Sequence, residues 1–108
     1  MHVGDLDGVS TTTQKSWNAN VTIEIHTENH GMADGVMVTG VWDDGAPGMC
    51  FTDGSGRCSV SRGAIPRKMS SARFTVTAAT HASFVFSPGA NHDPDRDSNG
   101  TTVAIIRQ

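Results

Sequence analysis

Leucine and tyrosine are almost missing from this sequence: of 108 residues, Leu6 is the single leucine and none is a tyrosine. A helical protein of this size needs many Leu and Ala residues at a spacing of about 3.6, so the scarcity of Leu argues against a helix bundle. Charged residues make up 18 % of the chain and the formal net charge is −3. This balance argues against a nucleic-acid-binding protein, which would carry a basic face. No apolar run is long enough to predict a membrane-spanning helix.

The residues that are abundant favour β-structure. Thr and Val are frequent, and 12 glycines together with Asn and Asp divide the chain into short segments. In the segment NANVTIEIHT every second residue is apolar, which predicts a strand with one face in the core. The segment VMVTGVW predicts a second such strand, and we expect the face that carries Trp42 to be the buried one.

Further strands are expected on both sides of these two segments. The segment MCFTDGSGRCSVS is interpreted as a hairpin with DGSG as its turn. The segment SARFTVTA predicts a strand with Ala72, Phe74, Val76 and Ala78 inward, and ASFVF continues or follows it. A short piece around HVGDL and the final TTVAIIRQ complete about seven or eight strands, arranged as one all-β sandwich over residues 1–108.

The order of these segments resembles a known family. VTIEIHTENHGMADGVMVTGVW, CFTDGSGRCSVS, ARFTVTAATHASFVF and NHDPDRDSNGTTVAI together are similar to a bacterial immunoglobulin-like domain of the fibronectin III or invasin kind. Such modules are appended to large secreted proteins, often C-terminal to the catalytic domain of an extracellular hydrolase. The resemblance implies an antiparallel immunoglobulin-like sandwich that acts as an accessory module and contacts neighbouring domains of a parent protein. It specifies the fold better than the function.

Cys50 and Cys58 stand symmetrically about Gly54. Free, metal-binding and paired cysteines are all conceivable, but the spacing is not C-x-x-C, and a cross-strand position in a tight hairpin favours a disulfide. A structural disulfide implies an oxidising compartment, which agrees with a secreted or extracellular protein.

The segment NHDPDRDSNGT places Asp93, Asp95 and Asp97 at alternate positions, followed by Asn99. Calcium binds six to eight oxygen ligands, and this spacing lets a curled loop direct several oxygens at one centre. The segment is not an EF-hand, so a complete site needs further ligands. In an immunoglobulin-like sandwich the chain start lies at the same pole, and there Asp5 and Asp7 are the candidates. The alternative is a solvated acidic turn.

Two functions remain open for this chain. No nucleophile motif such as G-x-S-x-G is present, so we expect a non-catalytic protein rather than a small enzyme. A structural module that acts as a spacer, stabiliser or surface anchor is the first candidate. A carbohydrate-binding module is the second, because Trp17 and Phe51 are expected to face solvent and aromatic rings can stack on a polysaccharide.

Overall fold

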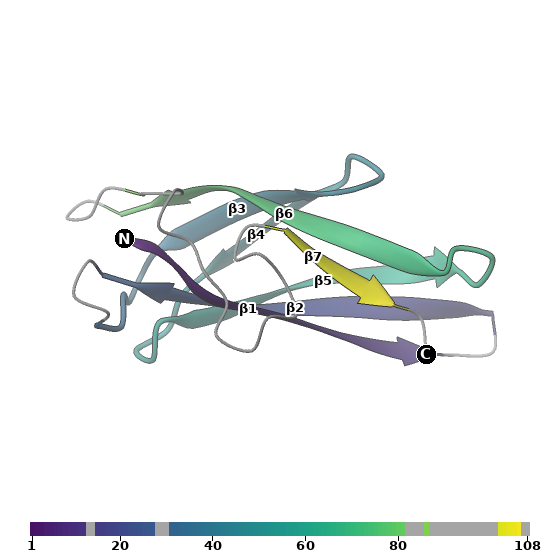
Figure 1. Ribbon diagram of the computed structural model, residues 1–108, viewed down its shortest axis with the longest axis horizontal. Coiled ribbons are helices and arrows are strands. Elements are labelled where there is room, and N and C mark those ends of the chain that lie inside the picture. The colour runs from purple at the N-terminus through teal and green to yellow at the C-terminus, as the bar shows by residue number, and fades with distance from the viewer. Residues whose placement is uncertain (13–14, 28–30, 82–85, 87–101, 107–108) are drawn as a thin grey trace.

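The protein is an antiparallel β-sandwich of two sheets in a computed structural model (Figure 1). The structure describes residues 1–12, 15–27, 31–81, 86 and 102–106. Its strands are β1 (His2–Thr12), β2 (Ser16–His26), β3 (Met37–Trp42), β4 (Pro47–Phe51), β5 (Arg57–Pro66), β6 (Ser71–Thr80) and β7 (Thr102–Ile106). One sheet has the order β1-β2-β5 and the other the order β4-β3-β6-β7. The all-β sandwich that the sequence predicts is therefore confirmed. Among the described residues, no helix is long and apolar enough to span a membrane.

Strand β2 follows its alternating sequence along its whole length. Ala19, Val21, Ile23 and Ile25 are fully buried, as the pattern predicts. The alternation also includes Trp17, two residues before Ala19, which is fully buried. The indole Nε1 of Trp17 donates a hydrogen bond of 3.0 Å to the Met69 carbonyl. The expectation that Trp17 faces solvent is wrong: it is the first core residue of the strand.

Strand β3 buries the face that carries Trp42. Trp42 is 2 % exposed and its ring lies 5.0 Å from that of Phe74 on the neighbouring strand β6. Gly40, two residues before Trp42, leaves room for the phenyl ring, since a Cβ at this position would lie 2.4 Å from the Phe74 Cζ atom. The predicted orientation of this strand is confirmed.

Strand β6 departs from simple alternation at one point. Its register with β3 shifts next to Thr39, which pairs with Ala78, and Thr77 is the additional residue. Such a bulge moves the residues that follow it to the other face. Ala79 is therefore buried at 7 % exposure and Ala78 is only half-buried, so the expectation that Ala78 points inward is wrong.

The segment from β4 to β5 is not a hairpin. Strand β4 is an edge of the four-stranded sheet, β5 is an edge of the three-stranded sheet, and the chain crosses from one sheet to the other between them. DGSG does form a turn, in which Gly56 adopts a φ of 77° and donates a hydrogen bond of 2.9 Å to the Asp53 carbonyl. The predicted disulfide between Cys50 and Cys58 is present, with 5.7 Å between the Cα atoms, and it joins the two sheets rather than two strands of one sheet.

The first strand is longer than the sequence suggests. Residues 2–12 pair with β2 along nearly its whole length, with a register shift between Val3 and Asp5. Gly4 lies within that shift, and a Cβ there would lie only 2.2 Å from the His26 ring.

The last strand agrees with the prediction. Of the expected strand ASFVF, residues 82–85 lie outside the described residues, and Phe86 packs half-buried against the core.

The two ends of the sandwich hold different parts of the chain. At one end, here called the entry pole, β1 begins and β2 ends, with His2 opposite His26. At the other end, the exit pole, β1 and β7 both end, and the Ser10 hydroxyl donates a hydrogen bond of 2.9 Å to the Ile106 carbonyl. The molecule measures 44 × 24 × 22 Å, so the two poles terminate an elongated sandwich.

Candidate functional site

A charged depression lies on the outer face of the three-stranded sheet. Strand pairing sets Asp5 opposite Glu24, Asp7 opposite Thr22, and Glu24 opposite Arg57, so these side chains are cross-strand neighbours. Together they line a hollow of about 280 Å³, which we call the acidic depression. Three carboxylates face one guanidinium there, so the depression carries excess negative charge.

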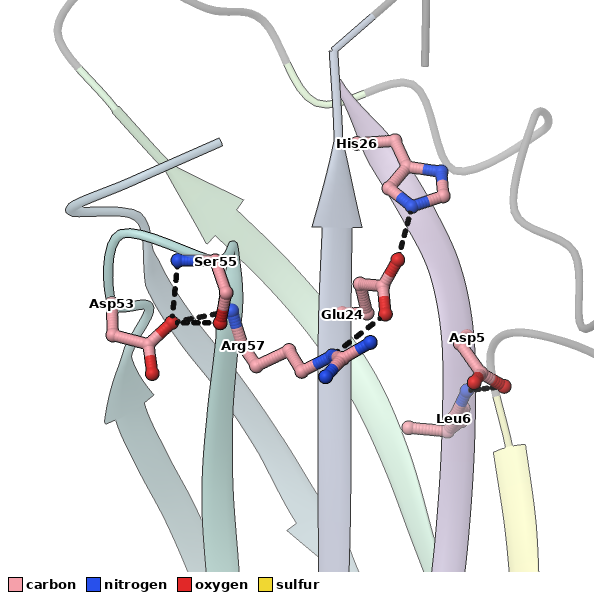
Figure 2. Close-up of polar contacts among 7 residues, drawn as sticks. All are labelled: Asp5, Leu6, Glu24, His26, Asp53, Ser55 and Arg57. Atoms are coloured by element: carbon pink, nitrogen blue, oxygen red, sulfur yellow. Dashed lines mark hydrogen bonds and ion pairs between the residues drawn. The ribbon is translucent and has the colours of Figure 1, made fainter. Parts of the chain in front are cut away.

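Glu24 is the best-bound carboxylate of the acidic depression. Its side chain is 12 % exposed and lies between His26 and Arg57 (Figure 2). The Arg57 Nε donates a hydrogen bond of 2.8 Å, and the His26 Nε2 lies 2.5 Å from the other oxygen. Because an ionised carboxylate only accepts hydrogen bonds, this histidine nitrogen carries the proton. Burial disfavours the charged form of Glu24, but the hydrogen bonds from His26 and Arg57 outweigh it and hold the pKa of the carboxyl below its usual value.

The turn that follows β4 fixes the backbone of Arg57. Asp53 Oδ1 accepts hydrogen bonds from the Ser55 hydroxyl at 2.6 Å, the Ser55 amide at 2.9 Å and the Arg57 amide at 3.2 Å (Figure 2). The hydrogen bond from the Ser55 side chain contributes most to a lowered pKa of Asp53, followed by the two backbone amides. The turn therefore positions Arg57 so that its guanidinium reaches Glu24, which in return raises the pKa of the arginine.

The two remaining carboxylates have different surroundings. Asp5 Oδ1 accepts a hydrogen bond of 3.0 Å from the amide of Leu6. The Asp5 carboxylate also interacts electrostatically with the positive charge of Arg57. Asp7 Oδ1 is buried, and no described residue donates a hydrogen bond to it. A buried carboxylate oxygen without a donor is unfavourable, so this atom is the one most open to a cation or a further donor.

The predicted calcium ligands are described only in part. Asp5 and Asp7 lie along β1 and line the acidic depression together with Arg57. Asp93, Asp95, Asp97 and Asn99 lie outside the described residues. Within the ranges that the structure does describe, no group of three His, Cys, Asp or Glu residues could hold a metal ion. Calcium therefore stays a prediction, and Asp7 is the described residue that fits it best.

Calcium is expected to raise the thermal stability of the protein. If the ligand set forms, calcium at a tenfold excess over its Kd should stabilise the fold by about 1.4 kcal/mol. Chelator should lower the midpoint of thermal unfolding, and calcium should restore it better than magnesium, which dehydrates reluctantly. Asp95→Ala should abolish this response, whereas Asp43→Ala, an exposed aspartate at the exit pole and outside the predicted set, should keep it. Unfolding curves that calcium and chelator leave unchanged would identify the segment as a solvated turn.

The two aromatic rings expected to contact a ligand do not lie together. Phe51 is 60 % exposed at the end of β4, whereas Trp17 is buried in the core. The platform for stacking a sugar that the sequence suggests is therefore not formed by this pair. Met49 is 56 % exposed on the same side of β4, so the exposed apolar side chains of this edge are Met49 and Phe51 rather than two aromatic rings.

A cavity at the exit pole was not foreseen from the sequence. It has a volume of about 140 Å³, lies between the two sheets and is here called the Trp42 cavity. Its lining includes Trp42, Asp43, Asp44, Arg62, Ile65 and Met69. These residues come from the end of β3, the turn after it, the end of β5 and the loop before β6. No local sequence pattern signals a site assembled from such distant segments.

Comparison of the chain with protein-family models, with curated protein sequences and with solved structures finds no match in any of the three.

Proposed function

We propose that this chain is a non-catalytic accessory module of a larger secreted protein, an extracellular hydrolase by the resemblance of its sequence, and that it acts as a spacer. The observation that carries the proposal is the placement of the first and last strands. Strand β1 begins at the entry pole, and Ile106 of β7 lies beside Ser10 at the exit pole. Strand β1 separates the two poles by about 30 Å at the usual rise of a strand.

A module in which β1 begins at one pole and β7 ends at the other separates its neighbours within a chain of domains. Its neighbours are held apart by the long axis of 44 Å, whereas a module whose ends met at one pole would bring its neighbours together. The disulfide supports the extracellular setting, because such bonds persist in oxidising compartments. It also supports the spacer role, since it joins β4 to β5 at one open side of the sandwich.

Two arginine–carboxylate pairs among the described residues connect separate elements of the fold. Arg57 bonds to Glu24 across two strands, and Arg62 on β5 bonds to Asp44 in the β3–β4 turn at 2.6 Å. The second pair joins the two sheets at the exit pole. Such contacts favour a stabilising role for these charged groups over a role in acid–base chemistry.

The spacer is testable with two copies of the full chain joined head to tail. Small-angle scattering should give a particle whose longest dimension is roughly twice the 44 Å of one copy. A compact particle in which the copies lie side by side would contradict the spacer. The same protein should not co-sediment with insoluble polysaccharides. Sedimentation that Phe51→Ala abolishes would instead favour the carbohydrate-binding module.

A further inference from the structure

We propose that the Trp42 cavity binds a small monocyclic organic cation, with the ring between the two sheets and the charged group at the mouth beside Asp43. This inference is independent of the spacer, because it concerns one cavity of the module and not the path of the chain. It is carried by three features of the cavity: its size, its rigid apolar wall and the unbalanced charge of its mouth.

The size of the cavity matches a single six-membered ring. Its volume is about 140 Å³. An apolar protein cavity of about 150 Å³ is known to accept benzene, so a ring with one short substituent is the largest occupant expected here. A disaccharide or a nucleotide is too large for this volume, and a single water would leave most of the wall without contacts.

The walls are apolar and come from both sheets. Trp42, at 2 % exposure, and Ala72, at 4 %, belong to the four-stranded sheet, and Ile65, at 5 %, belongs to the other. Met69 covers the cavity from the loop before β6 and remains 42 % exposed. An apolar ring would therefore exchange water contacts for a lining that is largely hydrocarbon, which is favourable in proportion to the area covered.

The loop that covers the cavity is held in place before any ligand arrives. The Met69 carbonyl accepts the hydrogen bond of 3.0 Å from the indole of Trp17, and the Met69 amide donates one of 2.9 Å to the Pro66 carbonyl. The ordering of this loop is therefore part of folding. A preformed cavity binds a small ligand more tightly than one that must form on binding.

Among the residues that line the cavity, two aspartates stand against one arginine, so the lining has one negative charge more than positive charges. Asp44 accepts hydrogen bonds from Arg62 Nη2 at 2.6 Å and from Arg62 Nε at 3.2 Å, so these two charges compensate each other. The hydrogen bond from Arg62 also holds the pKa of Asp44 below its usual value, and the carboxylate stays ionised at neutral pH. Asp43 lies beside this pair, and its carboxylate has no ion pair or hydrogen bond with any residue that the structure describes. Among the charged lining residues, Asp43 is therefore the group with which a bound cation can pair.

The experiment compares three probes of similar shape that differ in charge: benzylammonium, benzyl alcohol and benzoate. Amide shifts in the full chain are followed by NMR at low ionic strength. A ligand of about eight non-hydrogen atoms is expected to bind with a Kd of about 1 mM. Benzylammonium should shift the amides of Ala72 and Met69 and should bind about fivefold more tightly than benzyl alcohol, as a partly exposed charge contact would produce. Benzoate should bind least.

Variants separate the role of the charge from that of the cavity. Asp43→Asn should remove the fivefold preference and leave the affinity for benzyl alcohol unchanged, while Asp34→Asn, an exposed aspartate outside the cavity lining, should change neither. Ala72→Leu should fill the cavity and abolish binding of both probes. Because Ala72→Leu can also disturb folding, the proposal is decided by the comparison of Asp43→Asn with its control Asp34→Asn. If the amides of Ala72 and Met69 do not shift, or if benzylammonium keeps its full advantage in the Asp43→Asn protein, the proposal is wrong.

Discussion

Replacement of Trp42 by alanine is expected to destabilise the protein by about 3–5 kcal/mol, the usual cost of truncating a buried large aromatic residue. The indole is 2 % exposed and lies 5.0 Å from the ring of Phe74. It also forms a wall of the Trp42 cavity. Removal of the indole would enlarge a cavity that already exists, and the neighbouring strands cannot close on it without losing their pairing with each other.

The control for this prediction lies on the opposite face of the same strand. Met37 is half-buried on the outer side of β3, so Met37→Ala should cost about 1 kcal/mol or less. Urea unfolding curves of the two variants and the unchanged protein give the three free energies directly. Similar losses in both variants would mean that the two faces of β3 contribute alike to the core, contrary to the structure.

The alternation of apolar residues predicts strands where nothing interrupts it. In β2 it identifies all the core residues from Ala19 to Ile25, and in β3 it identifies the face of Trp42. It fails in β6 because Thr77 is an additional residue opposite β3, and a bulge reverses the faces without any local signal in the sequence. It also fails to extend β1, where Gly4 and the register shift beside it break the pattern.

The assignment of strands to sheets needs information that a local pattern does not hold. DGSG is correctly predicted as a turn, but the same turn serves two paired strands or two strands in different sheets. Which of these forms depends on whether β5 pairs with β4 or with β2, and β2 offers a longer apolar partner. The prediction of the disulfide survives this error because both arrangements bring Cys50 close to Cys58.

For the candidate sites too, the sequence predicts local features but not the contacts that depend on how the strands assemble. The sequence selects Asp5 and Asp7 as candidate ligands at the start of the chain, and both line the acidic depression. Their neighbours Glu24 and Arg57 follow only from the register of three strands, which a single sequence does not reveal. The Trp42 cavity depends on the relative position of two sheets, so it becomes visible only in the folded chain.

Loss of the disulfide is expected to destabilise the protein by about 2–3 kcal/mol. Cys50 and Cys58 are separated by eight positions, and closing so short a loop restricts the unfolded chain by about this amount. The bond joins β4 and β5, which lie in different sheets and share no backbone pairing. Without the bond, this side of the sandwich depends on side-chain packing and on the turn at Asp53.

Unfolding in urea with and without reductant measures this contribution. The native protein should yield no alkylated thiol without reductant, and reduction should lower the midpoint of unfolding. A double variant, Cys50→Ala with Cys58→Ala, should unfold at the lower midpoint in both conditions, which separates loss of the bond from other effects of the reductant. Two alkylated cysteines in the untreated protein would show that the bond does not form. A midpoint that reduction leaves unchanged would show that packing alone holds the two sheets together at this edge.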